Sequence, residues 1–296
     1  MELVIEPRVR DLDGLSVERV LPSIQRRMLG PFIFLDHVGP TVLRPPIAMD
    51  VRPHPHIGLA TVTYLLEGEI LHRDSLGSAQ VIQPGAINWM TAGRGIVHSE
   101  RTPPELRAGT SPLHGIQLWV ALPRAHEEAA PSFRHHPARS LPTLREGGCE
   151  IRLLAGRAFG VDTPVETHSP LFLADVTLPA GSVLPIPADH VERSAYVIEG
   201  ELEAGPDRVG TGRLVVIRPG DAPRLVARGP TRVALLGGEP LGEPRHAWWN
   251  FVSSSRERIE QAKADWAAGR FPRVPGDEVE FVPLPDHGPR DERSRT

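Results

Sequence analysis

The sequence predicts an all-β protein built from two similar β-barrels. Three observations support this prediction: the 296 residues include 28 Gly and 32 Pro, short apolar runs alternate with turn residues, and one block of sequence occurs twice. So much Gly and Pro favours many short strands joined by tight turns over long helices. The apolar content of 40% is enough for a sizeable core and excludes a globally disordered chain.

The predicted strands follow one another at the spacing typical of β-sandwiches and β-barrels. In the first half, β-branched and aromatic runs separated by Gly-containing turns predict an antiparallel meander at residues 61–66, 70–73 and 79–83. Further strands are predicted at residues 115–122, 171–178, 195–201, 214–218 and 231–236.

An internal repeat divides these strands between two units. The heptapeptide YLLEGEI that begins at Tyr64 recurs 132 residues later as YVIEGEL at Tyr196, and the Pro-Gly turn at 84–85 recurs at 219–220. Repeated blocks in the same order indicate a duplicated structural unit. We therefore expect an N-terminal barrel at residues 1–135 and a C-terminal barrel at residues 150–240.

The C-terminal segment, residues 241–296, contains the one clear helix signal. Ser254 and Glu257 form a capping box, and an amphipathic pattern follows them. The polar and aperiodic end of the chain, residues 286–296, is predicted to be frayed.

Composition excludes several classes of function. With 33 basic and 37 acidic residues the net charge is -4, which gives no electrostatic basis for direct nucleic-acid binding. A single cysteine, Cys149, excludes an intramolecular disulfide and a Cys-based metal cluster, which fits a cytoplasmic protein. No signal peptide and no apolar run of about 20 residues is present, so we expect neither export by that route nor membrane insertion.

Two pairs of polar residues predict a metal site in the N-terminal barrel. Residues i and i+2 of a strand point to the same face, so His54 and His56 can present two imidazoles together, and His98 and Glu100 can do the same from another strand. Three nitrogens and one carboxylate suit iron, manganese, copper, nickel or zinc better than calcium or magnesium. Four ligands would leave open positions on an octahedral ion for chemistry.

The repeat provides an internal comparison for this site. With 13 His in the chain, about one half of a His-x-His pair is expected by chance, so the spacing alone is weak evidence. By the register of the repeat, however, the second unit has apolar residues at all four positions: Ile186, Ala188, Val233 and Leu235. This pattern predicts one barrel with a site and one structural barrel without metal ligands.

Three segments resemble the pirin family of the cupin superfamily. They are RPHPHIGLATVTY from Arg52, HRDSLG from His72 and NWMTAGRGIVHSE from Asn88, with further similarity at GPFIFLDH from Gly30 and VPGD from Val274. The resemblance implies a bicupin, in which two jelly-roll barrels are arranged in tandem. It also implies that His54, His56, His98 and Glu100 bind iron, usually Fe(II), with another divalent transition metal as the alternative.

The same resemblance implies a quercetin 2,3-dioxygenase, an oxidoreductase that opens the ring of a flavonol and releases carbon monoxide. In that reaction Glu100 is expected to take the proton of the flavonol 3-hydroxyl. One position departs from the pattern, because many pirins have a glutamate where this chain has Ala60. Glu100 is therefore the only carboxylate in the predicted ligand set.

Two alternatives to flavonol oxidation stay open at this point. One is a metal- and redox-dependent regulatory protein that acts on a protein partner, as pirins have been linked to transcription regulators and to metabolic enzymes. The other is a cupin dioxygenase for a small molecule that is not a flavonoid. His72 and His114 are expected to be solvated or core residues, while Trp89 and Gln117 are assigned equally to the pocket and to the core.

Overall fold

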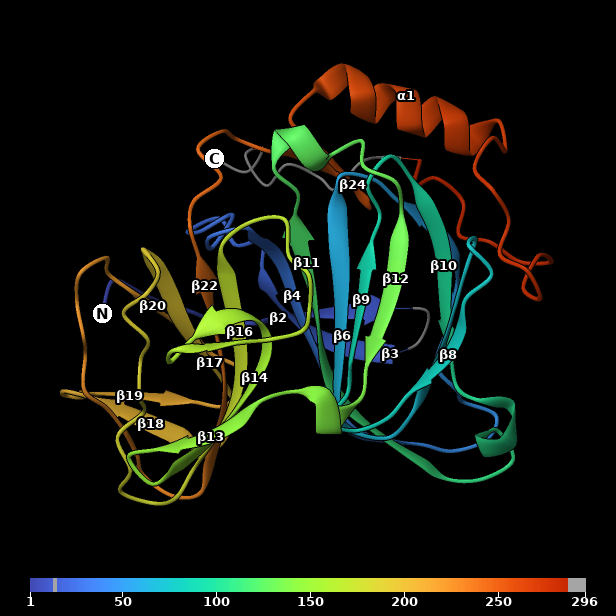
Figure 1. The fold of residues 1–296 in the computed structure, drawn as a ribbon. Coiled ribbons are helices and arrows are strands. Elements are labelled where there is room, and N and C mark those ends of the chain that lie inside the picture. The colour runs from blue at the N-terminus through green and yellow to red at the C-terminus, as the bar shows by residue number, and fades with distance from the viewer. Residues whose placement is uncertain (13–14, 287–296) are drawn as a thin grey trace, which may run out of the picture.

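Two β-barrels lie side by side, and the helix α1 (Arg256–Ala267) lies above one end of the first barrel (Figure 1). The structure is a computed structural model and describes residues 1–12 and 15–286. The all-β prediction is confirmed. Of the tail predicted to be frayed, only Asp286 belongs to the described residues, and 287–296 lie outside them.

The first barrel consists of a seven-stranded and a four-stranded antiparallel sheet. The larger sheet has the order β12-β9-β6-β11-β4-β3-β2, with β2 Arg8–Leu12, β3 Leu15–Leu21, β4 Phe32–Leu43, β6 Leu59–Glu67, β9 Ile87–Thr91, β11 Ser111–Ala121 and β12 Ser132–His136. The smaller sheet has the order β5-β10-β7-β8, with β5 Asp50–His56, β7 Ile70–Asp74, β8 Ala79–Ile82 and β10 Ile96–Arg101. Short 3-10 helices come after β10, β11 and β12, at Pro104–Leu106, Arg124–His126 and Ala138–Ser140.

The predicted meander is only partly correct. Strands β7 and β8 form a hairpin, but β6 lies in the other sheet and pairs with β9 and β11. A barrel closes by distributing consecutive strands between its two sheets, and local sequence patterns do not reveal that distribution.

The second barrel repeats this architecture. Its larger sheet has the order β1-β20-β17-β22-β16-β14-β13, and β15 pairs with β14. The strands are β1 Leu3–Ile5, β13 Thr143–Glu146, β14 Cys149–Ala158, β15 Val161–Asp162, β16 Leu171–Leu178, β17 Glu192–Glu199, β20 Leu214–Ile217 and β22 Thr231–Gly238. The smaller sheet, β19-β18-β21, contains β18 Glu201–Ala204, β19 Asp207–Gly210 and β21 Leu225–Ala227. Strand β1 was expected in the first barrel, but it pairs with β20 of the second.

The repeated heptapeptides occupy equivalent places in the two barrels. Each begins in a central strand of a large sheet, β6 or β17, and each contains a glycine with positive φ at the turn that follows. Gly68 has φ 82° and Gly200 has φ 85°, a conformation that glycine adopts without the strain a side chain would cause.

One equivalence inferred from the repeat is wrong. Strand β22 lies between β16 and β17, as β11 lies between β4 and β6, so β22 corresponds to β11 and not to β10. The counterpart of β10 is β21, because Leu225 pairs with Ala204 as Glu100 pairs with His72. The site strand therefore matches β21, where Leu225, the counterpart of Glu100, is apolar and buried, and the same register places Pro223 at the position of His98.

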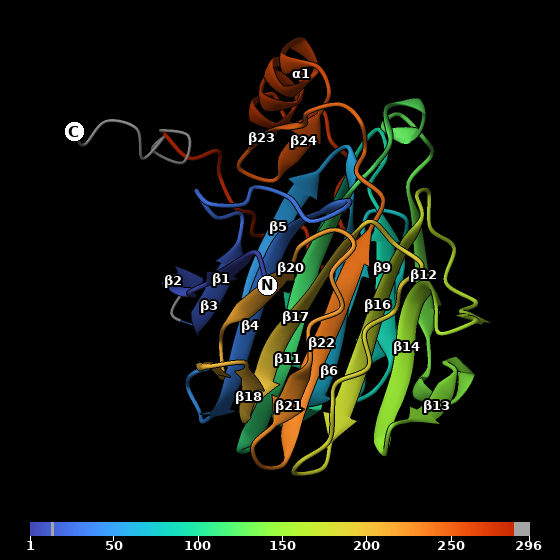
Figure 2. The ribbon, with the colours of Figure 1, turned by 90° about the vertical axis from the view of Figure 1, so that its left-hand side faces the viewer.

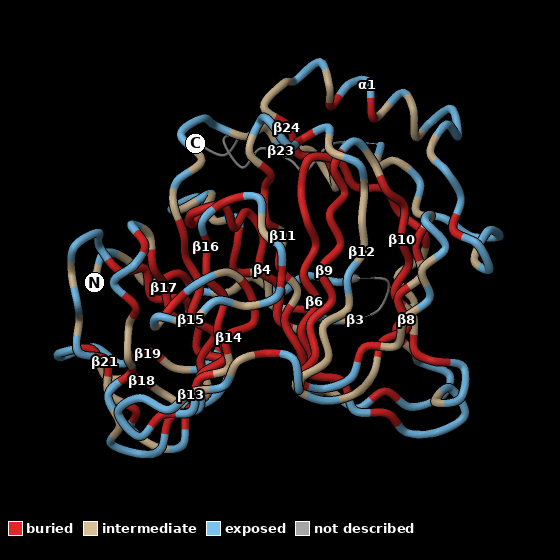
Figure 3. The backbone as a smooth tube through the Cα atoms, viewed as in Figure 1, coloured by how far each residue is buried: buried red, intermediate tan, exposed pale blue. Residues whose placement is uncertain are grey.

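The two large sheets pack face to face and form one core between the barrels. Figure 2 shows the strands of the two sheets as adjacent layers, and Figure 3 shows that most of these strands are buried. Tyr64 and Tyr196 are both fully buried in this core. The Tyr64 hydroxyl donates to Asp175 at 2.6 Å, and the Tyr196 hydroxyl lies 2.7 Å from Nδ1 of His37. Each barrel therefore provides one tyrosine whose hydroxyl contacts a polar side chain of the other barrel.

The C-terminal segment contains β23 His246–Trp248, β24 Phe251–Ser253 and the helix α1 Arg256–Ala267. The N-cap is Ser255 and not Ser254, because the Ser255 side chain accepts a hydrogen bond from the Arg258 amide. Ser254 instead donates from its amide and hydroxyl to buried Glu127. Strand β24 lies beside residue 57, where Ile57 bridges Phe251, so this segment covers one end of the first barrel. In the described part of the chain, no helix is long and apolar enough to cross a membrane.

Candidate metal centre

Three histidines from two neighbouring strands converge inside the first barrel. His54 and His56 lie two residues apart on β5, and β10 pairs with β5 so that His98 is directly opposite His54. All three side chains are buried, at 8%, 1% and 1% exposure. Their candidate ligand atoms lie within 4.8 Å of one another. The spacing argument therefore identified residues that the fold brings together.

The geometry of the three rings fits a transition-metal ion. Nε2 of His56 lies 3.1 Å from Nε2 of His98. Two nitrogens bound at 90° to an ion, each about 2.1 Å from it, are about 3 Å apart. Burial lowers the pKa of His56 and of His98 well below the usual value, and the neighbouring His54 lowers both further. The rings of His56 and His98 are therefore neutral near pH 7, which is the form that binds a metal.

Hydrogen bonds on the far side of the rings set their orientation. Nδ1 of His54 donates to the Arg52 carbonyl at 2.8 Å, which leaves the lone pair of the neutral ring on Nε2. Nδ1 of His98 lies 3.5 Å from Nδ1 of His72, and Nε2 of His72 lies 3.1 Å from Asp74. A carboxylate behind a histidine that supports a metal ligand is a recurrent arrangement in metal sites. His72 is thus a buried partner of His98, not a solvated residue.

Glu100 lies in the same cavity but is not a member of the close group of three histidines. A register shift between His98 and Glu100 places Glu100 opposite Val51 of β5. Its carboxylate is buried at 2% exposure and accepts hydrogen bonds from the Thr63 hydroxyl at 3.0 Å and the Gln117 amide at 2.8 Å. These two donors hold the Glu100 carboxyl group in place within the cavity.

The donors to Glu100 belong to a polar row that crosses the large sheet. Cross-strand pairing aligns Arg8, Arg19, Asp36, Gln117, Thr63, Asn88 and His135 in that order. The equivalent row of the second barrel is Leu153, Ala174, Leu235, Ala195, Val215 and Val4. Those residues pack into a hydrophobic core that fills the second barrel. The polar row therefore distinguishes the barrel with the site from the structural barrel.

Sequence reasoning missed most of this row. Gln117 does line the cavity, whereas Trp89 packs into the core between the barrels. Thr63 and Asp36 were not singled out, although their alternation with Val62 and Leu35, which lie in the core between the barrels, would have placed both on the inner face. His114 lies outside the site and contacts His37 at 2.8 Å between Nε2 atoms.

Position 60 also faces away from the site. Ala60, Val62 and Tyr64 alternate along β6 and point into the core between the barrels, whereas Thr63 points inward to Glu100. Ala60 is fully buried there. The departure at this position therefore does not remove a carboxylate from the metal centre.

A cavity of about 1260 Å³ reaches the centre, and His54, His56 and Glu100 are among its lining residues. Phe34 and Trp119 stack in parallel at 4.1 Å between ring centroids, and the Trp119 ring meets His56 edge to face at 5.1 Å. Arg19 lies over Phe34 at 4.4 Å and binds Asp36 with two hydrogen bonds of 2.8 Å. The cavity thus has an aromatic wall next to the histidines.

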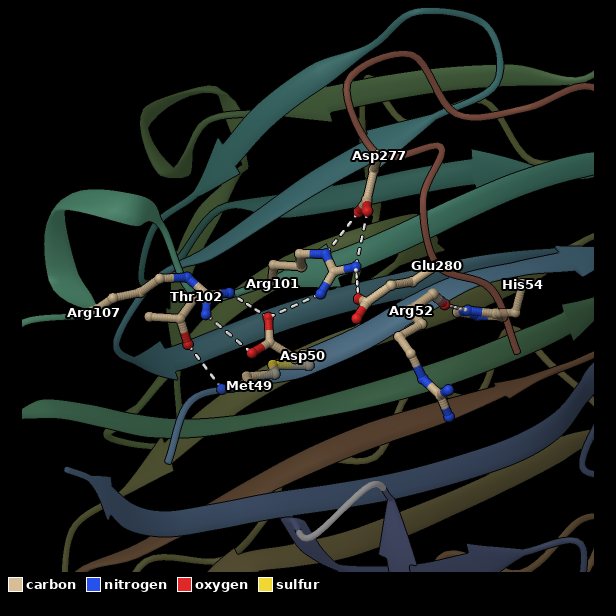
Figure 4. A network of polar contacts seen from close by, with 9 residues as sticks. All are labelled: Met49, Asp50, Arg52, His54, Arg101, Thr102, Arg107, Asp277 and Glu280. Carbon is tan, nitrogen blue, oxygen red and sulfur yellow. Dashed lines mark hydrogen bonds and ion pairs between the residues drawn. The ribbon is translucent and has the colours of Figure 1, made fainter. Parts of the chain in front are cut away.

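An ion-pair cluster fixes the strands that carry the ligands (Figure 4). Arg101 follows Glu100 on β10 and binds Asp277 at 2.7 and 2.8 Å, Glu280 at 2.9 Å and Asp50 of β5 at 3.1 Å. Arg107 also binds Asp50. Because Asp277 and Glu280 follow α1, this cluster ties the C-terminal segment to both ligand strands.

Comparisons with known proteins agree with this architecture. The Pirin family model matches residues 14–120, and the Pirin C-terminal cupin domain model matches residues 173–272. A pirin-like protein of Caulobacter vibrioides is 50% identical over 97% of this chain and 100% of its own length. A protein of Pseudomonas aeruginosa named as a candidate quercetin 2,3-dioxygenase is 42% identical over 92% of this chain and 87% of its own length.

Solved structures give the same assignment. A structure described as quercetin 2,3-dioxygenase from Acinetobacter baumannii superposes with a TM-score of 0.88 at 33% identity and covers 96% of each chain. Both barrels are thus cupin domains, arranged as in the pirin bicupins. With two family models and a half-identical relative spanning nearly its whole length, the chain belongs to the pirin family.

Proposed function

We propose that this protein is an iron-dependent oxygenase of the quercetin 2,3-dioxygenase type. The observation that carries the proposal is the convergence of three buried imidazoles next to an aromatic cavity large enough for a flavonol. The related proteins with that name support the choice of reaction. In this reaction one dioxygen adds to the flavonol, two ring carbon–carbon bonds break, and one carbon leaves as carbon monoxide.

His54, His56 and His98 would hold the metal ion, with Glu100 as a fourth ligand. A bound Fe(II) ion would supply Lewis acidity toward the flavonol 3-hydroxyl and electrons for oxygen chemistry. The donor set fits such an ion, because imidazole and carboxylate are ligands that iron accepts. The cavity lined by His54, His56 and Glu100 would give a substrate access to the ion.

Glu100 has a second role in the proposal as a proton acceptor. Its carboxylate, held by Thr63 and Gln117, would take the proton from the flavonol 3-hydroxyl. The wall formed by Phe34 and Trp119 would hold the flat ring system against the histidines and exclude water from the reacting carbons. The large sheet would thus supply the aromatic wall and the donors to Glu100, and β10 of the smaller sheet would supply the proton acceptor itself.

The test is turnover by protein loaded with Fe(II) under anaerobic conditions and then mixed with quercetin and oxygen. We expect equal amounts of oxygen consumed and carbon monoxide released. His56→Ala should lose iron and both signals. His168→Ala is the matched control, because this histidine is exposed and stacks on His126 away from the cavity, so the variant should keep both signals.

Stoichiometric iron without oxygen consumption or carbon monoxide release would refute the flavonol reaction. If iron were bound and a protein partner were recovered only in one redox state of the metal, the regulatory alternative would replace it. Zinc in protein purified without added metal, with no activation by iron, would refute the proposed oxygen chemistry.

A further inference from the structure

The charge of the cavity differs in sign from that of the whole chain. Its lining contains six arginines and four carboxylates, an excess of two positive charges, whereas the whole chain carries a net charge of -4. The charged residues are Arg8, Arg10, Arg19, Arg27, Arg245 and Arg256, and Asp11, Asp36, Glu100 and Glu260. A divalent ion on the histidines would add two more positive charges. Low-dielectric walls concentrate the field of such charges within a cleft.

Two of these arginines are neutralised within the protein. Arg19 forms the paired contact with Asp36, and Arg245 binds Glu127 at 2.8 Å. Glu260 is likewise engaged, because both of its oxygens contact Lys263. Arg10 and Arg27 line the same cavity as exposed residues.

Strand pairing directs part of this charge toward the cavity. Arg8 pairs with Arg19 across β2 and β3, and Arg10 pairs with Val17, which is buried and lines the cavity. Arg8 and Arg10 are two residues apart and so lie on the same face of β2. Arg27, from the loop between β3 and β4, lines the same cavity. We call Arg8, Arg10 and Arg27 the arginine rim.

The aromatic wall and the arginine rim line the same cavity. The wall runs from His56 through Trp119 and Phe34 to Arg19, and Arg19 is the cross-strand neighbour of Arg8. A ligand that reached from the metal centre to the rim would contact flat apolar rings along its length and guanidinium groups at its end. Guanidinium groups pair well with carboxylate, sulfonate and phosphate oxygens.

We propose that the substrate is a flat aromatic molecule that carries an anionic group, with its rings on the aromatic wall and its anionic group at the arginine rim. This inference rests on the proposed function, because it names the class of substrate that the same centre oxidises. An aromatic acid, or a flavonol that bears an acidic substituent, would satisfy it better than an uncharged flavonol.

The test compares two ligands of the same shape and different charge. Calorimetry on the full-length protein as purified, under argon, would measure binding of naphthalene-2-sulfonate and of neutral 2-(methylsulfonyl)naphthalene. We expect the sulfonate to bind at least about fivefold tighter at low salt, and the preference to shrink as salt is added. Both probes are redox-inert, so the result does not depend on turnover.

The variant Arg10→Gln/Arg27→Gln removes two exposed rim charges and should reduce the preference to less than about twofold, with binding of the neutral sulfone unchanged. The control Arg139→Gln/Arg218→Gln removes two exposed charges that do not line the cavity, so it should keep the preference. No preference in the native protein, a preference that survives in the rim variant, or an equal loss in the control would overturn the inference.

The failure of this inference is distinguishable from failure of the proposed function. Quercetin turnover without any preference for the sulfonate would leave the oxygenase in place and remove the anionic substrate. A preference that depends on the rim, in a protein that never consumes oxygen with quercetin, would keep the anion site and remove the flavonol reaction.

Discussion

The pH dependence of stability should depend strongly on His37, which is buried between the two barrels. Its side chain is 2% exposed and lies between the Tyr196 hydroxyl and His114. Burial, together with the neighbouring His114, lowers the pKa of His37 from 6.5 to about 4. The unfolded chain therefore binds a proton at this residue more readily than the native protein between these two pH values.

The sign and magnitude follow from linkage between proton binding and folding. Because the native pKa is the lower one, the stabilisation is fully present above pH 6.5 and is lost as the pH falls toward 4. A difference of 6.5 against about 4 corresponds to about 3 kcal/mol at most, and about 2 kcal/mol of it is lost between pH 7.5 and pH 5.

The assay is urea unfolding of metal-free protein at pH 7.5 and pH 5.0. His37→Gln should be less stable than the native protein at pH 7.5, because it disturbs two buried hydrogen bonds. Its loss of stability on acidification should be smaller than the native loss by about 2 kcal/mol. His126→Gln, which changes an exposed histidine, should leave the native loss unaltered. Equal losses in the native protein and in His37→Gln would refute the reasoning.

Three further predictions concern the metal centre and the strands and turns around it. His72→Phe should keep the stacking on Phe133 but weaken metal binding by about tenfold to a hundredfold, because His98 loses its hydrogen-bond partner. Competition with a chromophoric chelator measures the metal affinity, and an unchanged affinity would contradict the prediction. Ala60→Glu should lower the unfolding free energy by about 3 kcal/mol or more, since the new carboxylate would be buried between the barrels. The affinity for iron should not rise, and a gain in affinity would place residue 60 in the metal site instead. Gly58→Ala should lower the free energy of unfolding by about 2–4 kcal/mol, because φ is +68° and a Cβ would lie 1.9 Å from the Val252 carbonyl oxygen. Thermal or urea unfolding measures this, and an unchanged stability would mean that the close contact is absent.

Cross-strand geometry explains why local patterns identified only part of the site. His54 and His56 share a face because alternation along a strand has a period of two residues, and this relation is readable from the sequence. That His98 lies opposite His54 depends on the pairing of β5 with β10, which are 44 residues apart at these positions. The resemblance to pirins implied this pairing, and the barrel provides it.

The polar row and the core between the barrels could not be inferred in the same way. Thr63 and Gln117 belong to strands β6 and β11, and only their pairing brings both side chains to Glu100. The assignment of Val233 and Leu235 as counterparts of the ligands failed for the same reason, because equivalent strands were identified by spacing and not by their neighbours.

By itself the sequence determined the class of the fold, the duplication, the positions of most strands and the shared face of His54 and His56. These properties depend on turn residues, on alternation and on repetition, which act over a few residues or recur in register. Only the tertiary structure decided that β1 joins the second barrel, that Ala60 faces away from the centre and that arginines of β2 line the cavity. Those properties depend on which strands are neighbours, and barrel closure sets neighbours among residues far apart in the chain.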